Sequence, residues 1–241
     1  MRNDLPEAAQ IHTLVSQLTS IERQLMKSML SGKVSDFFDR NNRLRPCTEQ
    51  ETGEFFQLAD LLRRLTPASE QIPSDGIAYR GFCELIDPDL LAALQREALQ
   101  RRHEPLDRTD HYLGCGGPLA DRLSVLPQLT AFVASHVGPV AASGIASYLY
   151  YDAAGLGIRP HIDTEVFSIN LMLMLQHDCP TDVEPSATVV FPAYEAPQSH
   201  RLRIGEMMIM YGSSVIHTRS PVRSGENIHL LTLGFKRLLP T

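Results

Sequence analysis

The stretch RPHIDTEVFSINLMLML, residues 159–175, joins a short polar motif to the most apolar run of the chain. The apolar part, residues 168–175, is too short to span a membrane and has the length of a buried strand. In an extended chain, residues i and i+2 point to the same side, so His161 and Asp163 can present an imidazole and a carboxylate to one point. The stretch therefore predicts a buried strand that follows a candidate metal-binding pair.

Further short strands are predicted on both sides of this motif. They cover residues 145–151, 166–175, 187–191, 206–211, 214–219 and 228–236, with clusters of Gly, Pro, Asp and Ser between them. Because no helical periodicity separates them, they favour a sandwich or barrel over a parallel α/β sheet. Upstream, the pattern predicts a strand over 78–85, a helix from Asp87 and Pro88 to about Arg101, a loop over 103–118 and a helix over 119–137.

The first 75 residues have a different, helical pattern. Apolar residues at three- and four-residue spacing predict a helix over 6–30, with Gly32 as its C-cap. A second helix is predicted from Thr48, where Glu51 completes a capping box, to residue 65. We therefore expect a helical extension over 1–75, which buttresses a barrel or forms a homodimer contact, and a core with buttressing helices over 76–241.

Composition limits the kinds of partner. A formal net charge of −6 argues against a general nucleic-acid binder, because phosphate neutralisation needs a surplus of Lys and Arg. The chain shows no signal-peptide pattern and no run that could span a bilayer. Its four cysteines form no CxxC pair and are expected to be reduced thiols. We therefore expect a cytoplasmic protein that binds neither nucleic acid nor membranes.

A third metal ligand is available on a later predicted strand. His217 lies between GEMMIMYG and the turn SPVRSGEN, whereas His161 and Asp163 end the loop DAAGLGIRPHID. Both positions are strand ends, where a barrel would place ligands. Two His and one carboxylate on one face of an octahedron leave three positions open, which is the arrangement of non-haem Fe(II) oxygenases. An HxD pair with a distant His is a weak signal by itself.

The order of motifs over about residues 79–237 resembles the iron(II)/2-oxoglutarate-dependent dioxygenase superfamily, in particular its prolyl-4-hydroxylase-like branch. The matching positions are Tyr151 with Gly155, Arg159-Pro160, His161 and Asp163, SINLMLML, Thr188 to Pro192, Gly205, His217, Pro221-Val222, Gly225 and IHLLTLGF. For this part of the chain the resemblance implies a double-stranded β-helix (a jelly-roll or cupin-like barrel). Together with the N-terminal helical extension, which the resemblance does not cover, it gives an α+β fold. It also implies Fe(II), 2-oxoglutarate and O2 as cofactors, with His161, Asp163 and His217 as the catalytic metal ligands.

One position departs from the family pattern. The family usually carries Lys or Arg about ten residues after the distal His, where the cation pairs with 2-oxoglutarate, but this chain has Asn227. Arg219, on the strand face of His217, or Arg223 in the next turn is the expected replacement. The alternative is that both arginines are surface charges. The other residues expected to contact the co-substrate are Tyr151, Asn227 and His229.

The resemblance implies hydroxylation of an aliphatic C–H bond, since Asp163 fills the position that related radical halogenases leave open for chloride. We expect a small polar substrate, either a free amino acid or a natural-product intermediate. Two alternatives stay open. One is a cupin-like metal enzyme that does not use 2-oxoglutarate, although the usual HxH motif is absent. The other is a non-catalytic ligand-binding barrel, which Asn227 would favour.

Overall fold

The computed structural model describes residues 13–15, 17–45, 48–103, 106–182 and 184–238. Its strands are β1 Ile77–Gly81, β2 Leu106–Asp107, β3 Tyr112–Cys115, β4 Val140–Tyr151, β5 Ile169–Asp178, β6 Thr188–Phe191, β7 Gln198–His200, β8 Met207–Met210, β9 Ile216–Arg219 and β10 Asn227–Arg237. Its helices are α2 Ser20–Val34, α3 Glu49–Arg64, α4 Pro88–Arg101, α5 Pro118–Ser124 and α6 Pro127–Val137, with 3-10 turns at Ser35–Phe37, Ser69–Gln71 and Glu165–Phe167.

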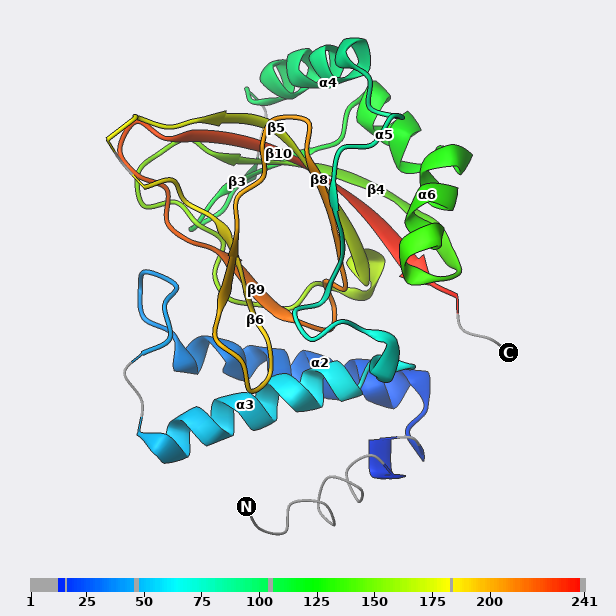
Figure 1. The fold of residues 1–241 in the computed structure, drawn as a ribbon, viewed down its shortest axis with the longest axis vertical. Helices are drawn as coiled ribbons and strands as arrows, with labels where there is room; N and C mark the ends of the chain where they lie inside the picture. Colours follow the sequence, from blue (N-terminus) through cyan, green and yellow to red (C-terminus); the bar gives the residue numbers. More distant parts are fainter. Residues whose placement is uncertain (1–12, 16, 46–47, 104–105, 183, 239–241) are drawn as a thin grey trace.

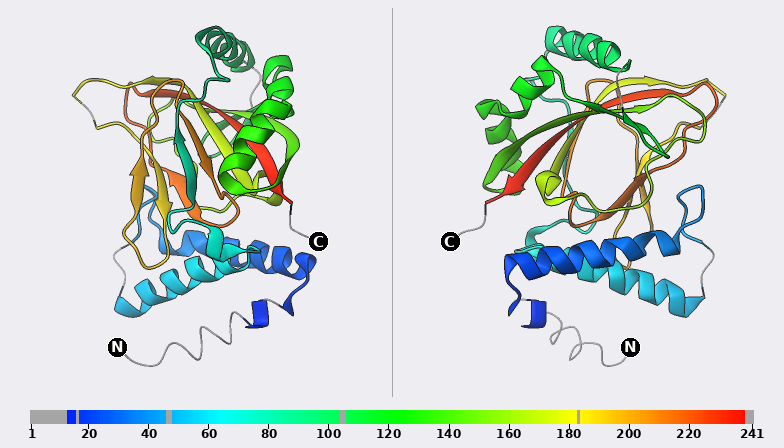
Figure 2. Two further views of the ribbon diagram at one scale, coloured as in Figure 1. Left: turned by 45° about the vertical axis from the view of Figure 1, so that its right-hand side comes forward. Right: turned by 180° about the vertical axis from the view of Figure 1, so that it is seen from behind.

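The strands form two antiparallel sheets that face each other (Figure 1). The larger sheet has the order β1-β8-β5-β10-β4-β3-β2, and the smaller one has the order β7-β6-β9. Helices α4, α5 and α6 cover the outside of the larger sheet, and α2 and α3 lie side by side beneath the smaller one (Figure 2). This layering confirms the expected double-sheet α+β architecture, although the sheets do not close into one continuous barrel.

Strand β5 is apolar at nearly every position because both of its faces are covered. Ile169, Leu171 and Leu173 belong to the apolar core beneath the outer helices. Met172 and Met174 point the other way, into a second core between the sheets. A sheet that is buried on both sides loses the polar alternation of a half-exposed strand. This explains why the run is continuous in the sequence. Within the sheet, β5 lies between β8 and β10.

Local capping signals set the helix starts. Helix α3 begins after Thr48 with the predicted capping box to Glu51, and α4 begins at Pro88 with Asp87 as its N-cap. The helix predicted over 6–30 is interrupted: residues 13–15 and 17 are helical, but the helix breaks at Leu18 and Thr19. Helix α2 then begins at Ser20 and continues to Val34, so Gly32 is not its C-cap. Thr19 and Glu22 form a capping box that fixes this start. The predicted residues 6–12 lie outside the described part.

Two other predictions are corrected in the core, and one strand was not predicted. The loop predicted over 103–118 contains the short strands β2 and β3, which pair as a hairpin. The helix predicted over 119–137 is two helices, because Pro127 lacks an N–H and disfavours the helical conformation at the preceding Leu126. The three-residue strand β7 was not predicted, since it is too short to show a pattern. No helix in the described ranges has the length and apolar character needed to cross a membrane.

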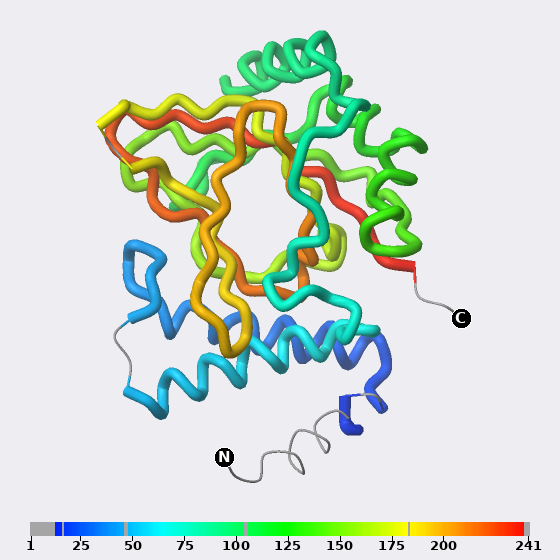
Figure 3. Tube along the Cα trace, in the orientation of Figure 1, coloured from blue at the N-terminus to red at the C-terminus, as the bar shows by residue number. Residues whose placement is uncertain are grey.

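The N-terminal helices share an apolar core with the smaller sheet. Phe191 at the end of β6 packs edge-on against Phe38 and Phe55, at centroid distances of 4.8 and 6.3 Å. Figure 3 shows the turn between β6 and β7 reaching α3, where Tyr194 contacts Phe56 at 5.5 Å. These aromatic contacts attach α2 and α3 to the sheet that carries β9. The division of the chain at residue 75 stays a prediction, as does a dimer contact.

Replacing Phe55 by Ala should destabilise the protein by about 3–5 kcal/mol, because its 2% exposed ring fills the core between α3 and β6. Ile21→Ala is the matched control: Ile21 is 76% exposed on α2, and its loss should change the free energy of unfolding by less than about 0.5 kcal/mol. Urea denaturation of both variants measures the difference. Equal effects would contradict the packing of the helices on the smaller sheet.

Candidate metal centre

Backbone hydrogen bonds bring the three predicted ligands to one point. The amide of His161 donates to the carbonyl of His217 at 3.0 Å, and the reverse bond measures 2.9 Å. The amide of Asp163 donates to the carbonyl of Gly212 at 2.8 Å. Because directly opposed residues of an antiparallel pair project to the same side, the imidazoles lie next to each other, with ring centroids 4.4 Å apart.

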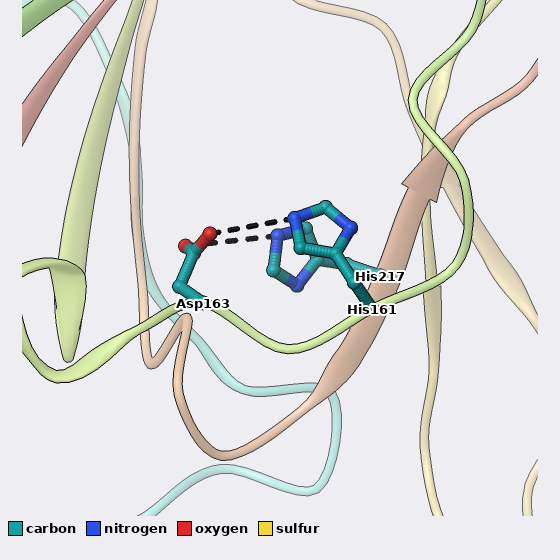
Figure 4. Close-up of side chains that lie close together, drawn as sticks. All are labelled: His161, Asp163 and His217. Carbon is teal, nitrogen blue, oxygen red and sulfur yellow. Dashed lines mark ion pairs between the residues drawn. The ribbon is translucent and has the colours of Figure 1, made fainter. Parts of the chain in front are cut away.

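The donor atoms fit a single metal ion. Figure 4 shows the carboxylate of Asp163 facing both imidazoles, with Oδ1 3.4 Å from His161 Nε2 and Oδ2 3.7 Å from His217 Nε2. All three ligand atoms lie within 4.8 Å of one another. Nitrogen and oxygen ligands bind transition metals at about 2.0–2.2 Å, so atoms sharing one ion lie about 3–4 Å apart. The side chains need little movement to coordinate it.

Outer hydrogen bonds orient each ligand. Nδ1 of His161 lies 2.7 Å from the carbonyl of Arg159, and Nδ1 of His217 lies 3.0 Å from the carbonyl of Val215. A proton on each Nδ1 is therefore donated to a carbonyl, which leaves the Nε2 lone pair free for a metal. The amide of Asn170 donates to Asp163 Oδ2 at 2.8 Å. These partners fix both the tautomers and the carboxylate.

Burial controls the charge of the ligands. It lowers the pKa of His217 to about 4, so this imidazole is neutral at pH 7, which is the form that binds metals. Burial alone would raise the pKa of Asp163, but the two neighbouring imidazoles and the Asn170 amide outweigh it and hold the pKa below its ordinary value. Burial alone would lower the pKa of His161, but the hydrogen bond and charge of Asp163 outweigh it and raise the pKa above its ordinary value, so a metal ion competes with a proton for this imidazole. The site therefore offers two imidazole nitrogens and one carboxylate, a donor set that suits Fe(II).

A cavity of about 220 Å³ opens beside these ligands. Arg219 lies on its wall, two residues after His217 on β9, and is 3% exposed. Its Nη2 donates to Ser186 Oγ at 3.0 Å, and its guanidinium lies 5.6 Å from the ring of Tyr151. Its Nε has no hydrogen-bond partner among the described residues. Burial lowers the pKa of Arg219 to about 10, so it stays charged at pH 7.

This buried cation is not paired within the described residues, since no carboxylate there lies within 4.0 Å of its nitrogens. A buried charge without a partner is costly, and a carboxylate that accepts from the guanidinium would relieve that cost.

The side chain of Asn42, from the N-terminal extension, donates to the carbonyls of Gly157 and Arg219 at 2.9 Å each. This contact ties the end of β9 to the loop before His161.

The structure brings Tyr151 and Arg219 to the cavity wall, but not Arg223, Asn227 or His229. Arg223 is exposed in the turn before β10. On β10, Leu230 and Thr232 line the cavity, so Asn227 and His229 fall on the opposite face. His229 packs there against the ring of Tyr150, with centroids 5.0 Å apart. Of the two arginines expected to replace the missing cation, Arg219 is the one that lines the cavity.

Two features of the site were not predicted. His111 lines the cavity, with Nδ1 2.6 Å from Asp110 Oδ1, and the other oxygen of Asp110 accepts the amide of Arg159 at 3.0 Å. These residues lie in the hairpin that was expected to be a plain loop. Asn170 was also overlooked, although it is the polar exception in the apolar run INLMLML and so carried a signal.

The sequence matches no model of a known protein family and no curated protein. Solved structures are similar to the chain. They include a prolyl-4-hydroxylase from Pseudomonas putida (TM-score 0.52, 17% identity, 68% of this chain and 94% of that one) and a 2OG-Fe(II) oxygenase family oxidoreductase from Burkholderia pseudomallei (0.53, 13%, 81% and 93%). A third is HygX from Streptomyces hygroscopicus with nickel, 2-oxoglutarate and hygromycin B bound (0.52, 11%, 70% and 85%). These similarities confirm the double-stranded β-helix fold.

Gly212→Ala should weaken Fe(II) binding at least about tenfold. A Cβ at this position would lie 2.1 Å from Asp163 Oδ2 and 2.9 Å from the carbonyl of Phe167, so the carboxylate must move. Gly53→Ala is the matched control, because a Cβ there, within α3, meets nothing within 4 Å. Anaerobic equilibrium dialysis measures both affinities. If Gly212→Ala binds Fe(II) as the control does, Asp163 is not a ligand in the geometry described.

Proposed function

We propose that this chain, which has the fold of the iron(II)/2-oxoglutarate oxygenase structures, is itself an Fe(II)/2-oxoglutarate-dependent oxygenase that hydroxylates an aliphatic C–H bond of a small polar molecule. The observation that carries the proposal is the placement of a His-Asp-His site on the wall of the same cavity as the buried Arg219, which has no carboxylate partner among the described residues. The metal ligands are His161, Asp163 and His217. The substrate is a free amino acid or a natural-product intermediate.

The co-substrate fits between the ligands and Arg219. 2-Oxoglutarate has a 2-oxo acid end that can chelate a metal and a second carboxylate at the far end. His217 and Arg219 share one face of β9, so a molecule anchored at the metal reaches the guanidinium along this strand. Arg219 then gains the carboxylate partner that it lacks in the described part of the protein. In this way β9 supplies the cation that the family pattern places at the position of Asn227.

When bound, iron(II) with 2-oxoglutarate and O2 supplies the oxidation of an unactivated C–H bond, with succinate and CO2 as co-products. The protein's part is to bind and orient. Asn170 holds the carboxylate of Asp163, and the apolar walls from β5 and β10 exclude water from the cavity. Asp163 occupies the position that a halide would need, which favours hydroxylation over halogenation.

The remaining wall of the cavity suits a small molecule with hydrogen-bonding groups. Ser147 and Thr232 offer hydroxyls, His111 offers an imidazole held by Asp110, and the rest is largely aliphatic. Two solved structures of the same fold contain larger bound molecules, hygromycin B in HygX and nogalamycin RO in the epimerase SnoN. They support a natural-product intermediate as one of the two substrate classes.

An anaerobic titration with Fe(II) and then 2-oxoglutarate tests the proposal. A weak visible charge-transfer band should appear with the wild-type protein and be lost in His217→Ala. Arg219→Met should raise the concentration of 2-oxoglutarate needed for the band at least about tenfold, because a charge-assisted contact is removed. Arg223→Met is the matched control, since this arginine is exposed and does not line the cavity.

Each alternative has its own outcome in this experiment. Bound iron without a band at any 2-oxoglutarate concentration would favour the cupin-like metal enzyme. No iron binding at all would favour the non-catalytic barrel. If the band forms equally in Arg219→Met and Arg223→Met, another group binds the distal carboxylate. Once a band is established, succinate formation in a screen of amino acids and natural-product intermediates identifies the substrate.

A further inference from the structure

A second cavity, of about 240 Å³, lies between α2, the connection from α3 to β1 and the end of β10. It shares no lining residue with the cavity of the metal centre. Four basic side chains line it, Arg23 and Lys27 from α2 and Lys236 and Arg237 from β10, against one carboxylate, Glu165. In a chain of net charge −6, this is a marked local concentration of positive charge.

Two positively charged side chains of α2 line this cavity next to each other. Arg23 and Lys27 are four residues apart, a spacing at which like charges on a helix repel each other. Lys27 is also 6% exposed, although Lys is seldom buried without a charged partner. The same helix leaves Ile21 76% exposed on its other side, whereas Lys27 is buried.

The partners of Lys27 are mostly neutral. Its Nζ donates to Thr66 Oγ1 at 2.7 Å and to Ser213 Oγ at 3.3 Å, whereas the carboxylate of Glu165 lies 3.8 Å away. Burial lowers the pKa of Lys27 to about 8, Glu165 offsets part of that effect, and the charge of Arg23 adds to it. The ammonium group is therefore only partly compensated by the protein.

Arg237 is also bound by neutral groups. Its guanidinium donates to the carbonyl of Pro67 at 2.9 Å and to Gln71 Oε1 at 3.4 Å. Within the described ranges, neither Arg237 nor Lys236 has an acidic group within 4.0 Å. Lys236 is exposed beside the cavity. Fixed cations with spare N–H donors around a hydroxyl-lined cavity are the usual surroundings of an oxyanion.

We propose that this cavity binds a small oxyanion with at least two negative charges, such as a phosphate monoester or a polycarboxylate. The anion accepts hydrogen bonds from Lys27 and Arg237 inside the cavity and is attracted by Arg23 and Lys236. Its binding relieves the repulsion within α2 and completes the compensation of the buried ammonium group. This site does not depend on the proposed oxygenase activity.

Isothermal titration calorimetry with inorganic phosphate and, separately, with citrate tests the site on the full chain. At low ionic strength the wild type should bind at least one of them with a Kd of about 1 mM or tighter. The double variant Arg23→Met/Lys236→Met should bind at least about tenfold more weakly, because two of the four charges are gone. Neither side chain is buried, so the variant should fold. Lys33→Met, an exposed position on the same helix outside the cavity, is the matched control and should bind as the wild type does.

The two probes also distinguish the source of the anion. Stronger binding of phosphate indicates a phosphorylated metabolite, and stronger binding of citrate indicates a polycarboxylate. The proposal is wrong if neither anion produces a heat of binding in the calorimeter or an increase in the melting temperature of the protein. It is also wrong if the double variant and Lys33→Met bind the anions equally well. Iron and 2-oxoglutarate binding by the wild type is measured separately, so failure here leaves the proposed function untouched.

Discussion

Two backbone hydrogen bonds between His161 and His217 hold the candidate site together. Opposed residues of an antiparallel pair project to one side, so this single register places both imidazoles in contact. The period of two in extended chain then adds Asp163 after His161 and Arg219 after His217. A slip of one residue would turn His217 and Arg219 away from the cavity together. One strand pairing therefore positions both candidate histidine ligands and the buried cation.

That pairing needs support from both sides of the smaller sheet, because this sheet has only three strands. The N-terminal helices supply the cover through Phe38 and Phe55, and Asn42 holds the carbonyl of Arg219 against the loop before His161. On the other side, the larger sheet is held by the core under α4, α5 and α6. The N-terminal segment, which lies outside the family resemblance, is thus part of the surroundings of the candidate site.

Sequence patterns predicted the features that depend on local chemistry. The caps at Thr48 and Asp87 and the apolar run of β5 needed no knowledge of distant contacts, and the period of two paired His161 with Asp163 correctly. The start of α2 was not predicted, although Thr19 and Glu22 have the pattern of a capping box. The apolar spacing continues across Thr19, so it indicated one longer helix. Whether Arg219 or Asn227 faces the cavity depends on the register of β9 and β10. The contact of His111 with the cavity depends on a hairpin of two- and four-residue strands, which leaves almost no pattern to read.

The bridge between His161 and His217 also bears on how a metal would act on the stability of the protein. The two histidines are far apart in sequence, and the unfolded chain offers at most the local pair of His161 and Asp163. The complete donor set exists only in the folded state, so an ion that uses all three groups binds that state preferentially. By mass action such an ion raises the free energy of unfolding by about 2.7 kcal/mol at a hundred times its dissociation constant. Resistance to heat and to proteolysis would then increase with the concentration of the metal. The metal-bound form of the protein would also be the form that is degraded most slowly.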